Sequence, residues 1–319
     1  MRGATILLLV ATLATGTALA ARLTQPRVPA NNPTTPAKAE LGRRMFYDAD
    51  LSADGTMACA TCHEQHRGFG DGNATHAGVH GDPARRNVPG LANVAWFTRY
   101  TWADPRIRTL EAQVLVPVLG DSPVEMGMKG QEAEIARRLS RDDCYRRLFA
   151  DAFPATGGRI DMASVAQALA AFERTLISYG APYDRAGKGG PPLDPLAQKG
   201  AALFRRDCAS CHSGVNFTDG RYHNVGVWVS GDRGLGEISG RLGDNGRFRT
   251  PSLRNVAVTE PYLHDGSART LETALSRHAG VRASGDIPAL VAFLGTLTDA
   301  NFLTDKRFSL PDRACGKAL

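Results

Sequence analysis

The sequence has little that would place the chain in a membrane, on a nucleic acid or in a β-rich class. After the first residues, no stretch approaches the roughly 20 consecutive apolar residues that a membrane-spanning helix needs. The net charge is +6, but no run of Lys and Arg stands out, so the basic balance predicts a solvated surface and no nucleic-acid binding. Alternating strand patterns are sparse. The chain is therefore expected to be mainly α-helical, with no membrane span.

Residues 1–20 resemble a secretory signal peptide. Arg2 precedes an apolar run over residues 6–14, and Ala18-Leu19-Ala20 has the small-x-small pattern of a cleavage site. The run is too short to span a membrane, although an uncleaved N-terminal anchor is the alternative. This segment predicts export, which in a bacterium means the periplasm.

Cysteine is scarce, and four of the six residues fall into two copies of one motif. These are Cys59-Ala-Thr-Cys62-His63 and Cys208-Ala-Ser-Cys211-His212. Cys-x-x-Cys-His is the attachment signature of c-type haem, in which the thiols bind the haem covalently and the histidine ligates the iron. A zinc site or a thioredoxin-like redox pair would leave a histidine after the second cysteine unexplained twice. The motifs therefore predict two covalent haem c groups.

The chain repeats itself around the two motifs. Residues 41–46 and 199–204 each have a helical pattern that leads into Cys-x-x-Cys-His. We predict a flexible lead over 21–38, an N-terminal haem domain over 39–186 and a C-terminal haem domain over 187–319, divided at a Gly- and Pro-rich stretch. The Gly-, Asn- and Asp-rich segments 66–95 and 213–260 predict long loops. The expected fold is mainly α, with two c-type cytochrome domains packed around an inter-haem interface.

Further helices are predicted from start signals and apolar spacing. Asp194 and Pro195 are typical of an N-cap followed by Pro at the first helical position. Val165, Leu169, Phe172 and Leu176 recur at helical spacing, and Asp286 with Pro288 marks another start. In addition, Thr270 can cap a helix in which Leu271, Ala274, Leu275 and His278 share one face. From periodicity alone, His278 is either an iron ligand or a core or capping residue.

Residues 40–310 resemble the bacterial di-haem cytochrome c peroxidase and MauG family. The matching stretches, besides the haem motifs, are Leu41 to Asp48, Arg85 to Pro89, Leu91 to Val94, Pro123 to Gly127, Phe248 to Val256 and Pro261 to Gly266. Within the family, Leu115 to Gly120 and Phe302 to Asp305 are most similar to the methanobactin-associated MauG-like enzymes. Those enzymes oxidise a tryptophan of a partner protein.

The resemblance implies distinct roles for the two halves. The N-terminal haem would react with H2O2, and the C-terminal haem would transfer electrons. Trp102, at the family's spacing from Asn87, would carry charge between them; its alternative role is that of a buried aromatic residue. The resemblance also implies a Ca²⁺ ion held by Asn87, Thr259 and Pro261, consistent with the oxygen ligands that Ca²⁺ prefers.

The peroxide pocket implied by the resemblance contains Gln113, Pro117 and Glu125. Glu125 would take a proton from H2O2 and return it to the leaving oxygen. By itself, a glutamate is most often a surface carboxylate. The chain has two more residues between Pro117 and Glu125 than typical peroxidases, which leaves the position of Pro117 less defined.

The second haem departs from the family at its distal ligand. This ligand is Met in the peroxidases and Tyr in the MauG-like enzymes, 17 residues after the calcium-binding proline, and here that position is His278. A second imidazole lowers the haem potential relative to Met. A His/His haem would accept electrons poorly from high-potential cytochromes but could store oxidising equivalents.

Other residues keep two interpretations. His76 and His80 follow the first haem motif, and either could be a switchable distal ligand, with His80 nearer the family register, or a solvated loop residue. His223 and His264 are expected to bond haem propionates or backbone. Cys144 and Cys315 are either a disulfide, which an oxidising compartment would permit, or free thiols.

Three function classes follow. The first is a peroxidase that reduces H2O2 with electrons from a small cytochrome c or a cupredoxin. The second is a MauG-like oxidase of Trp or Tyr residues in a partner protein. The third, a di-haem electron carrier, is the weakest, because a carrier has no need of Glu125 or of an open iron face. The oligomeric state, including a homodimer, is left open.

Overall fold

The structure is a computed structural model that describes residue 26 and residues 28–226, 231–281 and 283–318. The predicted signal peptide lies outside the described residues. Within them, no helix is both long and apolar enough to cross a membrane.

The fold is mainly α-helical, which confirms the predicted class. The helices of the N-terminal lobe are α1 (Pro36–Phe46), α2 (Cys59–Cys62), α3 (Leu110–Leu119), α4 (Glu132–Arg141), α5 (Asp143–Ala152) and α6 (Met162–Glu173). After them come α7 (Pro182–Ala186), α8 (Pro195–Asp207), α9 (Leu235–Ser239), α10 (Leu271–Arg277), α11 (Ile287–Gly295) and α12 (Ala300–Thr304). The described residues also form two antiparallel pairs of short strands: β1 (Tyr222–His223) with β2 (Phe248–Arg249), and β3 (Arg313–Ala314) with β4 (Lys317–Ala318).

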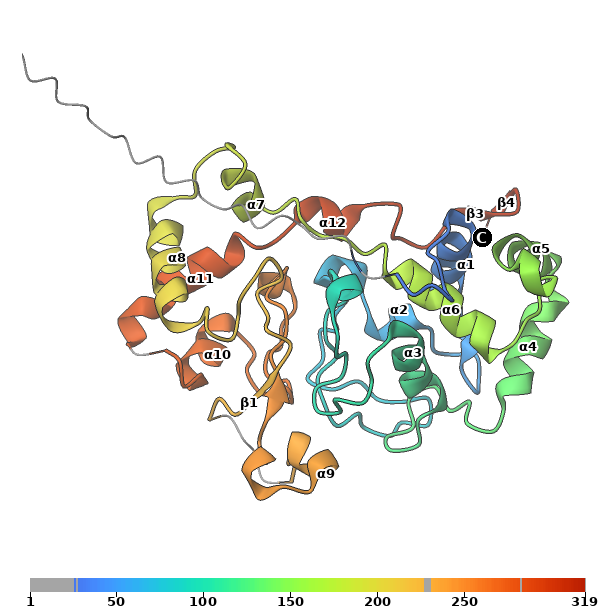
Figure 1. The fold of residues 1–319 in the computed structure, drawn as a ribbon, viewed down its shortest axis with the longest axis horizontal. Coiled ribbons are helices and arrows are strands. Elements are labelled where there is room, and N and C mark those ends of the chain that lie inside the picture. The colour runs from blue at the N-terminus through green and yellow to red at the C-terminus, as the bar shows by residue number, and fades with distance from the viewer. Residues whose placement is uncertain (1–25, 27, 227–230, 282, 319) are drawn as a thin grey trace, which may run out of the picture.

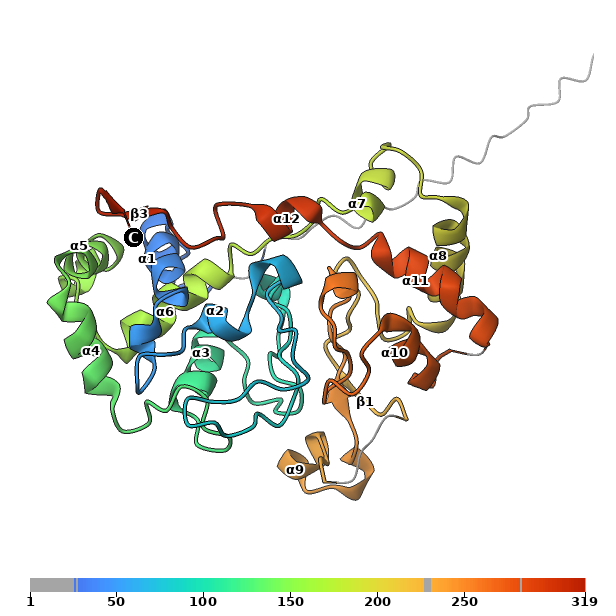
Figure 2. The ribbon, with the colours of Figure 1, turned by 180° about the vertical axis from the view of Figure 1, so that it is seen from behind.

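The molecule has two lobes, and the long loops of both lobes face each other between them (Figures 1 and 2). The N-terminal lobe has its core around α1 and α6, and the second lobe has its core around α8 and α11. Each core therefore contains the helix that leads into one Cys-x-x-Cys-His motif. The structure does not test the predicted division of the chain into domains at residues 186 and 187. However, Phe302 and Phe308 pack into the first core, so the chain returns to the N-terminal lobe after α11.

Helix starts agree with the sequence signals in most places. The Asp194 side chain accepts hydrogen bonds from the backbone N–H groups of Leu196 and Ala197, as predicted for an N-cap. Thr270 caps α10 in the same way. Helix α6 ends at Glu173, so Leu176 lies beyond it although its side chain is buried.

The predicted lead over 21–38 is too long. Thr35 caps α1, which begins at Pro36. Before it, Asn32 is buried, and its amide donates to the Glu111 carboxylate and to the backbone carbonyl of Gln167. These contacts could not be predicted from the Pro- and Asn-rich composition, because Asn32 makes them with residues far away in the chain.

One glycine in each lobe allows the two core helices to touch. A Cβ placed on Gly42 would lie 1.9 Å from the carbonyl oxygen of Ala168 in α6, and one on Gly200 would lie 1.8 Å from that of Ala289 in α11. The two glycines occupy matching places in the repeated segments ahead of the haem motifs. The close approach fixes each motif-bearing helix against its partner.

A buried network of hydrogen bonds joins the lobes. Asn93 and Asn255 both have left-handed backbone conformations, with φ of 61° and 59°. The Asn93 amide donates to the carbonyl oxygen of Ser178 at 3.0 Å, and the Asn255 amide donates to the hydroxyl of Ser178 at 3.0 Å. The backbone N–H of Asp299 donates to Asn255 at 2.8 Å, and the Asp299 carboxylate accepts from the backbone of Gly180. The chain crosses between the lobes twice, near Ser178 and near Asp299, and this network joins the two crossings.

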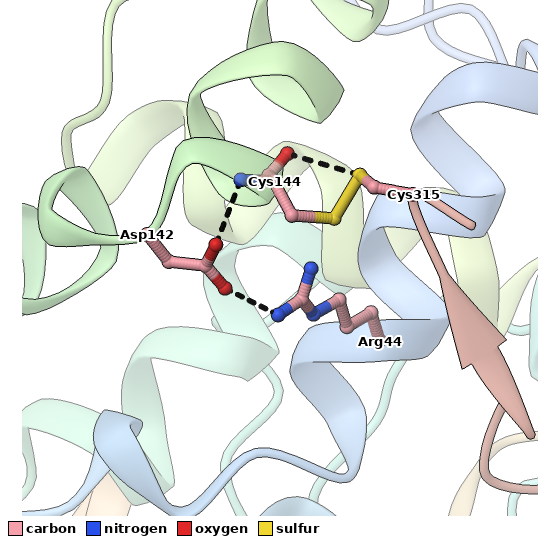
Figure 3. Close-up of a disulfide and its surroundings, with 4 residues drawn as sticks. All are labelled: Arg44, Asp142, Cys144 and Cys315. Carbon is pink, nitrogen blue, oxygen red and sulfur yellow. Dashed lines mark hydrogen bonds and ion pairs between the residues drawn. A yellow bond between two sulfur atoms is a disulfide. The ribbon is translucent and has the colours of Figure 1, made fainter. Parts of the chain in front are cut away.

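The C-terminal tail is tied to the N-terminal lobe by a disulfide between Cys144 and Cys315, which are separated by 171 residues (Figure 3). Next to it, the Asp142 carboxylate caps α5 through the backbone N–H of Cys144 and pairs with Arg44 of α1. The sequence left Cys144 and Cys315 as either a disulfide or free thiols, and in the structure they form a disulfide.

The helix contact at Gly200 generates a stability prediction. Gly200→Ala should lower the free energy of unfolding by about 3 kcal/mol, because the added methyl group meets a backbone carbonyl that cannot rotate away. Gly295→Ala is the matched control: its Cβ would meet nothing within 4 Å, so stability should stay the same or rise by about 0.5 kcal/mol. Urea unfolding followed by circular dichroism measures both. Equal stability of the two variants would contradict the close packing of α8 on α11.

Candidate haem sites and the cavity between the lobes

Each Cys-x-x-Cys-His motif folds as one helical turn that brings its histidine under the two cysteines. The backbone N–H of His63 donates to the carbonyl of Cys59 at 3.0 Å, and that of His212 donates to Cys208 at 2.9 Å. None of the four cysteines of the motifs takes part in a disulfide. The cysteines and the histidine of each motif therefore lie on one side of a short turn, as covalent haem attachment requires.

Both motif histidines are oriented by a backbone carbonyl. The Nδ1 of His63 lies 2.7 Å from the carbonyl oxygen of Phe69, and the Nδ1 of His212 lies 3.0 Å from that of Phe217. Phe69 and Phe217 both have positive φ, at 62° and 52°. A hydrogen bond at Nδ1 fixes the ring and leaves Nε2 for a metal, which is typical of histidine ligands. Sequence reasoning missed both phenylalanines, since their role is played by the backbone.

A large cavity opens around the second motif and reaches the facing loop of the N-terminal lobe. Eight of the predicted site residues line it: Asn87, Trp102, Cys208, Cys211, His212, Thr259, Pro261 and His278. Apolar side chains of α10 and α11, including Leu271, Leu275, Leu290 and Leu294, form much of the remaining wall. An apolar wall with a few convergent polar groups fits a haem.

His278 faces His212 across this cavity. The ring centroids are 6.3 Å apart. Two metal–nitrogen bonds of about 2 Å, with about 1.1 Å from each nitrogen to its ring centre, would give about 6.2 Å. The two rings are therefore spaced for one iron between them. The Nδ1 of His278 lies 3.3 Å from the backbone nitrogen of Gly280.

Helix α10 delivers His278 as the sequence indicated. Leu271, Ala274, Leu275 and His278 all line the cavity, so they share one helix face. His278 is also the C-cap of α10, directly after the last helical residue, Arg277. The capping interpretation is therefore confirmed, and the ligand role stays a prediction that the position of the ring in the cavity permits.

Burial keeps the facing histidines neutral. It lowers the pKa of His212 to about 4, and it also lowers the pKa of His278 and of His63. Neutral imidazole is the form that binds iron. The three rings therefore have the protonation state of ligands.

Trp102 spans the two lobes. Its indole Nε1 donates to the carbonyl of Asn87 at 2.7 Å, and its own carbonyl accepts from the backbone N–H of Arg249 in β2 at 2.8 Å. The side chain lines the cavity of the second motif. Trp102 is thus positioned by one hydrogen bond from each side of the lobe interface.

The residues of the predicted peroxide pocket lie in the N-terminal lobe, apart from this cavity. Gln113 and Pro117 are four residues apart on α3, so they share a helix face. The backbone N–H of Met126 donates to the carbonyl of Pro117 at 2.9 Å, which holds the loop that carries Glu125 against α3 despite its two additional residues. The Gln113 Oε1 is buried without a hydrogen-bond partner. An oriented acceptor of this kind fits a pocket for a small polar ligand.

Glu125 is half-buried, so it is not a fully exposed surface carboxylate. Burial raises its pKa above the ordinary value of 4.5, and the neighbouring His76 opposes this. The Nδ1 of His76 lies 2.7 Å from the buried carboxylate of Asp71. His80, in contrast, is exposed. Of the two loop histidines, His76 is the one whose charge acts on the Glu125 carboxylate.

The remaining histidines have other partners. The Nε2 of His223 lies 2.8 Å from the Asp219 carboxylate, which adds a partner to the expected propionates and backbone. His264 is buried, stacks on Phe248 with ring centroids 3.6 Å apart, and has an Nε2 without a partner. Both histidines line the cavity of the second motif.

Arg249 lies in one of the stretches that match the family, but the sequence alone indicated no role for it. It is buried and lines the cavity, and its guanidinium donates to the carbonyls of Tyr100, Thr101 and Thr250. Among the described residues, no Asp or Glu forms a salt bridge with it. A buried cation bonded to neutral carbonyls fits the carboxylates of a haem.

Comparisons with known proteins agree with this geometry. A family profile described as di-haem cytochrome c peroxidase matches residues 36–191. The chain is 37% identical to the methylamine utilization protein MauG of Methylorubrum extorquens, over 82% of this chain and 74% of that protein. It is 31% identical to the cytochrome c551 peroxidase of Pseudomonas aeruginosa, over 83% of this chain and 80% of that protein.

A solved structure resembles the whole fold. It is a MauG-like protein associated with microbial copper homeostasis, with a TM-score of 0.87 and 35% identity, covering 91% of this chain and 97% of that one. Two haem-attachment motifs, a helical fold and these relatives define a di-haem c-type oxidoreductase. The chain belongs to the di-haem cytochrome c peroxidase and MauG family.

The facing histidines generate the second prediction. In the haem-loaded protein, His278→Met should raise the midpoint potential of the C-terminal haem by about 0.1 V or more, part of the roughly 0.8 V range that axial ligands span, because a thioether favours reduced iron. Spectroelectrochemistry measures the shift. His66→Met is the control, since His66 is exposed in the N-terminal lobe and does not line the cavity. An unchanged potential in His278→Met would mean that another group is the ligand.

Proposed function

We propose that this protein is a peroxide-dependent, MauG-like oxidase that removes electrons from aromatic side chains of a partner protein. The observation that carries the proposal is the 6.3 Å separation of the His212 and His278 rings. When bound, the haems would supply redox chemistry: O–O bond cleavage at the N-terminal site and one-electron transfer at both. The roles of the surrounding side chains follow from their positions.

The paired histidines favour oxidation of a protein over reduction by a high-potential donor. Two imidazoles lower the potential of a haem relative to a His/Met pair. A low-potential C-terminal site would accept electrons poorly from cytochromes of high potential, whereas it would stabilise an oxidised state. The similarity to the MauG-like structure associated with copper homeostasis supports the same interpretation.

Glu125 and Gln113 act on the peroxide. As a carboxylate, Glu125 takes the proton of the oxygen that approaches the N-terminal site and returns it to the leaving oxygen, so that water departs. Gln113 offers its unpartnered Oε1 to the peroxide hydroxyl. Pro117 anchors the Glu125 loop through its carbonyl and fills the adjacent helix face.

Trp102 passes oxidising equivalents between the two sites. Its hydrogen bonds to both lobes hold the indole in one orientation, and its side chain reaches the cavity of the C-terminal haem. An indole gives up an electron more readily than the aliphatic residues around it. Charge can therefore cross the interface in two shorter steps.

A Ca²⁺ ion at Asn87, Thr259 and Pro261 is part of the proposal. The Asn87 amide nitrogen donates to the carbonyls of Asn73 and Ala74, which turns its oxygen in the opposite direction. Thr259 and Pro261 line the same cavity. An ion held from both lobes would reinforce the position of Trp102, whose indole bonds to Asn87. Oxygen ligands with few carboxylates suit Ca²⁺.

The proposed location is the periplasm, where c-type haem is attached and disulfides form. The Cys144–Cys315 disulfide supports this location, because such bonds persist in oxidising compartments.

The second candidate is a cytochrome c peroxidase, and the similarity to the P. aeruginosa enzyme favours it. Its electrons would come from a small cytochrome c or a cupredoxin. Steady-state turnover of H2O2 with a reduced cytochrome c distinguishes the two. Fast turnover would support the peroxidase, and oxidation of aromatic residues in a co-expressed partner protein without such turnover would support the MauG-like oxidase.

Glu125 generates a prediction with a pH signature. Glu125→Gln should slow the reaction of the haem-loaded enzyme with H2O2 by about 100-fold or more, because the amide cannot accept the proton. In the wild type, the rate should fall as the pH decreases through a pKa above 4.5, since burial favours the protonated acid and only the carboxylate is a base. Stopped-flow spectroscopy measures both. Glu40→Gln, at an exposed position of α1, is the control.

The variant should also lose the acidic limb of the pH profile. An unchanged rate, or an acidic limb that persists in Glu125→Gln, would assign proton transfer to another group, for which His76, whose charge acts on Glu125, is a candidate.

Trp102 generates a prediction about electron transfer between the two haem sites. Trp102→Phe should leave the absorption of both haems intact but remove the spectral change at the C-terminal haem after H2O2 is added, because phenylalanine is much harder to oxidise. Rapid-freeze EPR on the haem-loaded protein measures it. Trp96→Phe is the matched control, because Trp96 packs on Tyr179 and does not line the cavity. An unchanged response in Trp102→Phe would exclude the relay.

A further inference from the structure

Tyr183 is the exposed tyrosine beside the C-terminal haem site. Its relative exposure is 38%, whereas the other six tyrosines, all within the described part of the chain, are buried or half-buried. It lies in α7 at the outer edge of the C-terminal lobe, next to the segments that cross between the lobes (Figure 1). Neither the sequence motifs nor the proposed function gives it a role.

The ring of Tyr183 is packed against the group that orients His212. Its centroid lies 5.3 Å from that of Phe217 and 5.8 Å from that of Phe293, both edge-on. Phe217 accepts the hydrogen bond from the Nδ1 of His212 at 3.0 Å. A short path therefore runs from solvent through Tyr183, Phe217 and one hydrogen bond to the proximal histidine.

The surrounding contacts hold Tyr183 in place. Its backbone N–H donates to the carbonyl of Thr296 at 3.0 Å. The next residue, Asp184, forms a buried ion pair with Arg254, whose guanidinium lies over the Phe217 ring at 5.2 Å. A side chain that only covered the core at this place would need no hydroxyl group, yet this partly exposed residue is a tyrosine whose ring packs edge-on against Phe217 and Phe293.

We propose that Tyr183 is the redox relay at which electrons from the aromatic substrate side chain enter the C-terminal haem site. In the step, the Tyr183 phenol gives one electron to the oxidised C-terminal site and its proton to solvent, leaving a neutral phenoxyl radical. The phenoxyl then takes one electron and one proton from the side chain of the partner. Two such one-electron transfers supply the two electrons that reduce one H2O2 to two waters. The inference rests on the proposed function.

The chemistry of a phenoxyl at the surface gives the test. Without a partner, phenoxyl radicals on two molecules couple through ring carbons, so that one H2O2 and two tyrosines yield one dityrosine and two waters. The haem-loaded, full-length protein is treated with one equivalent of H2O2 in the absence of a donor. Covalent dimers are measured by denaturing electrophoresis and dityrosine fluorescence, and the cross-linked residue is located by peptide mass spectrometry.

We expect covalent dimers joined at Tyr183 in the wild type. Tyr183→Phe keeps the ring contacts with Phe217 and Phe293 but lacks the phenol, so cross-linking should fall to the level of a sample without H2O2, while haem content and the initial haem response to peroxide stay unchanged. Tyr47→Phe is the matched control. It removes the phenol of a half-buried tyrosine in the N-terminal lobe and should cross-link like the wild type.

Two results would overturn the inference. One is the absence of dimers in the wild type although the haem spectra respond to H2O2, and the other is cross-linking at a different tyrosine that persists in Tyr183→Phe. A lack of any haem response to H2O2 would instead overturn the proposed function itself. The failure of the relay and the failure of the enzyme are thus separate outcomes.

Discussion

The hydrogen bonds that meet at Ser178 determine how the two haem lobes sit against each other. Asn93 from the first lobe and Asn255 from the second both bond to this residue, and Asp299 bonds to Asn255 and to the neighbouring backbone. All these side chains are buried, so each lost partner would leave a polar group unsatisfied at a cost of about 1–3 kcal/mol. The lobes have separate cores, and this network fixes both chain crossings between them.

The site between the lobes depends on that constraint. Trp102 bonds to Asn87 on one side and to Arg249 on the other, so a small rotation of one lobe would break one of its two anchors. The cavity around His212 and His278 also receives residues from the facing loop of the N-terminal lobe. A redox relay works only over short distances, which is why a rigid interface matters more here than in a carrier with one haem.

The two lobes repeat one plan with different outcomes. Each has a glycine contact between two core helices, a motif histidine bonded to a phenylalanine carbonyl and an asparagine with positive φ. The first lobe adds Gln113 and Glu125 to this plan, and the second lobe adds His278. In the proposed function, the common part attaches the cofactor, and the added residues would make one site reactive toward peroxide and the other suited to storing charge.

The sequence by itself determined the local chemistry: the two haem motifs, the helices that lead into them, the N-caps at Asp194 and Thr270, and the face of α10 that carries His278. These features depend on residues a few positions apart, so spacing and side-chain type are enough to predict them. The start of α1 was placed too late, because the order of the preceding residues comes from the contacts of Asn32 with Glu111 and Gln167.

Only the tertiary structure decided what long-range contacts control. It paired Cys144 with Cys315, placed the half-buried Glu125 near His76, and set the rings of His212 and His278 6.3 Å apart. It also revealed the phenylalanine carbonyls, Arg249 and the exposed Tyr183. Backbone acceptors have no sequence signature, and burial and exposure depend on which distant segments pack together, so neither could be predicted from neighbouring residues.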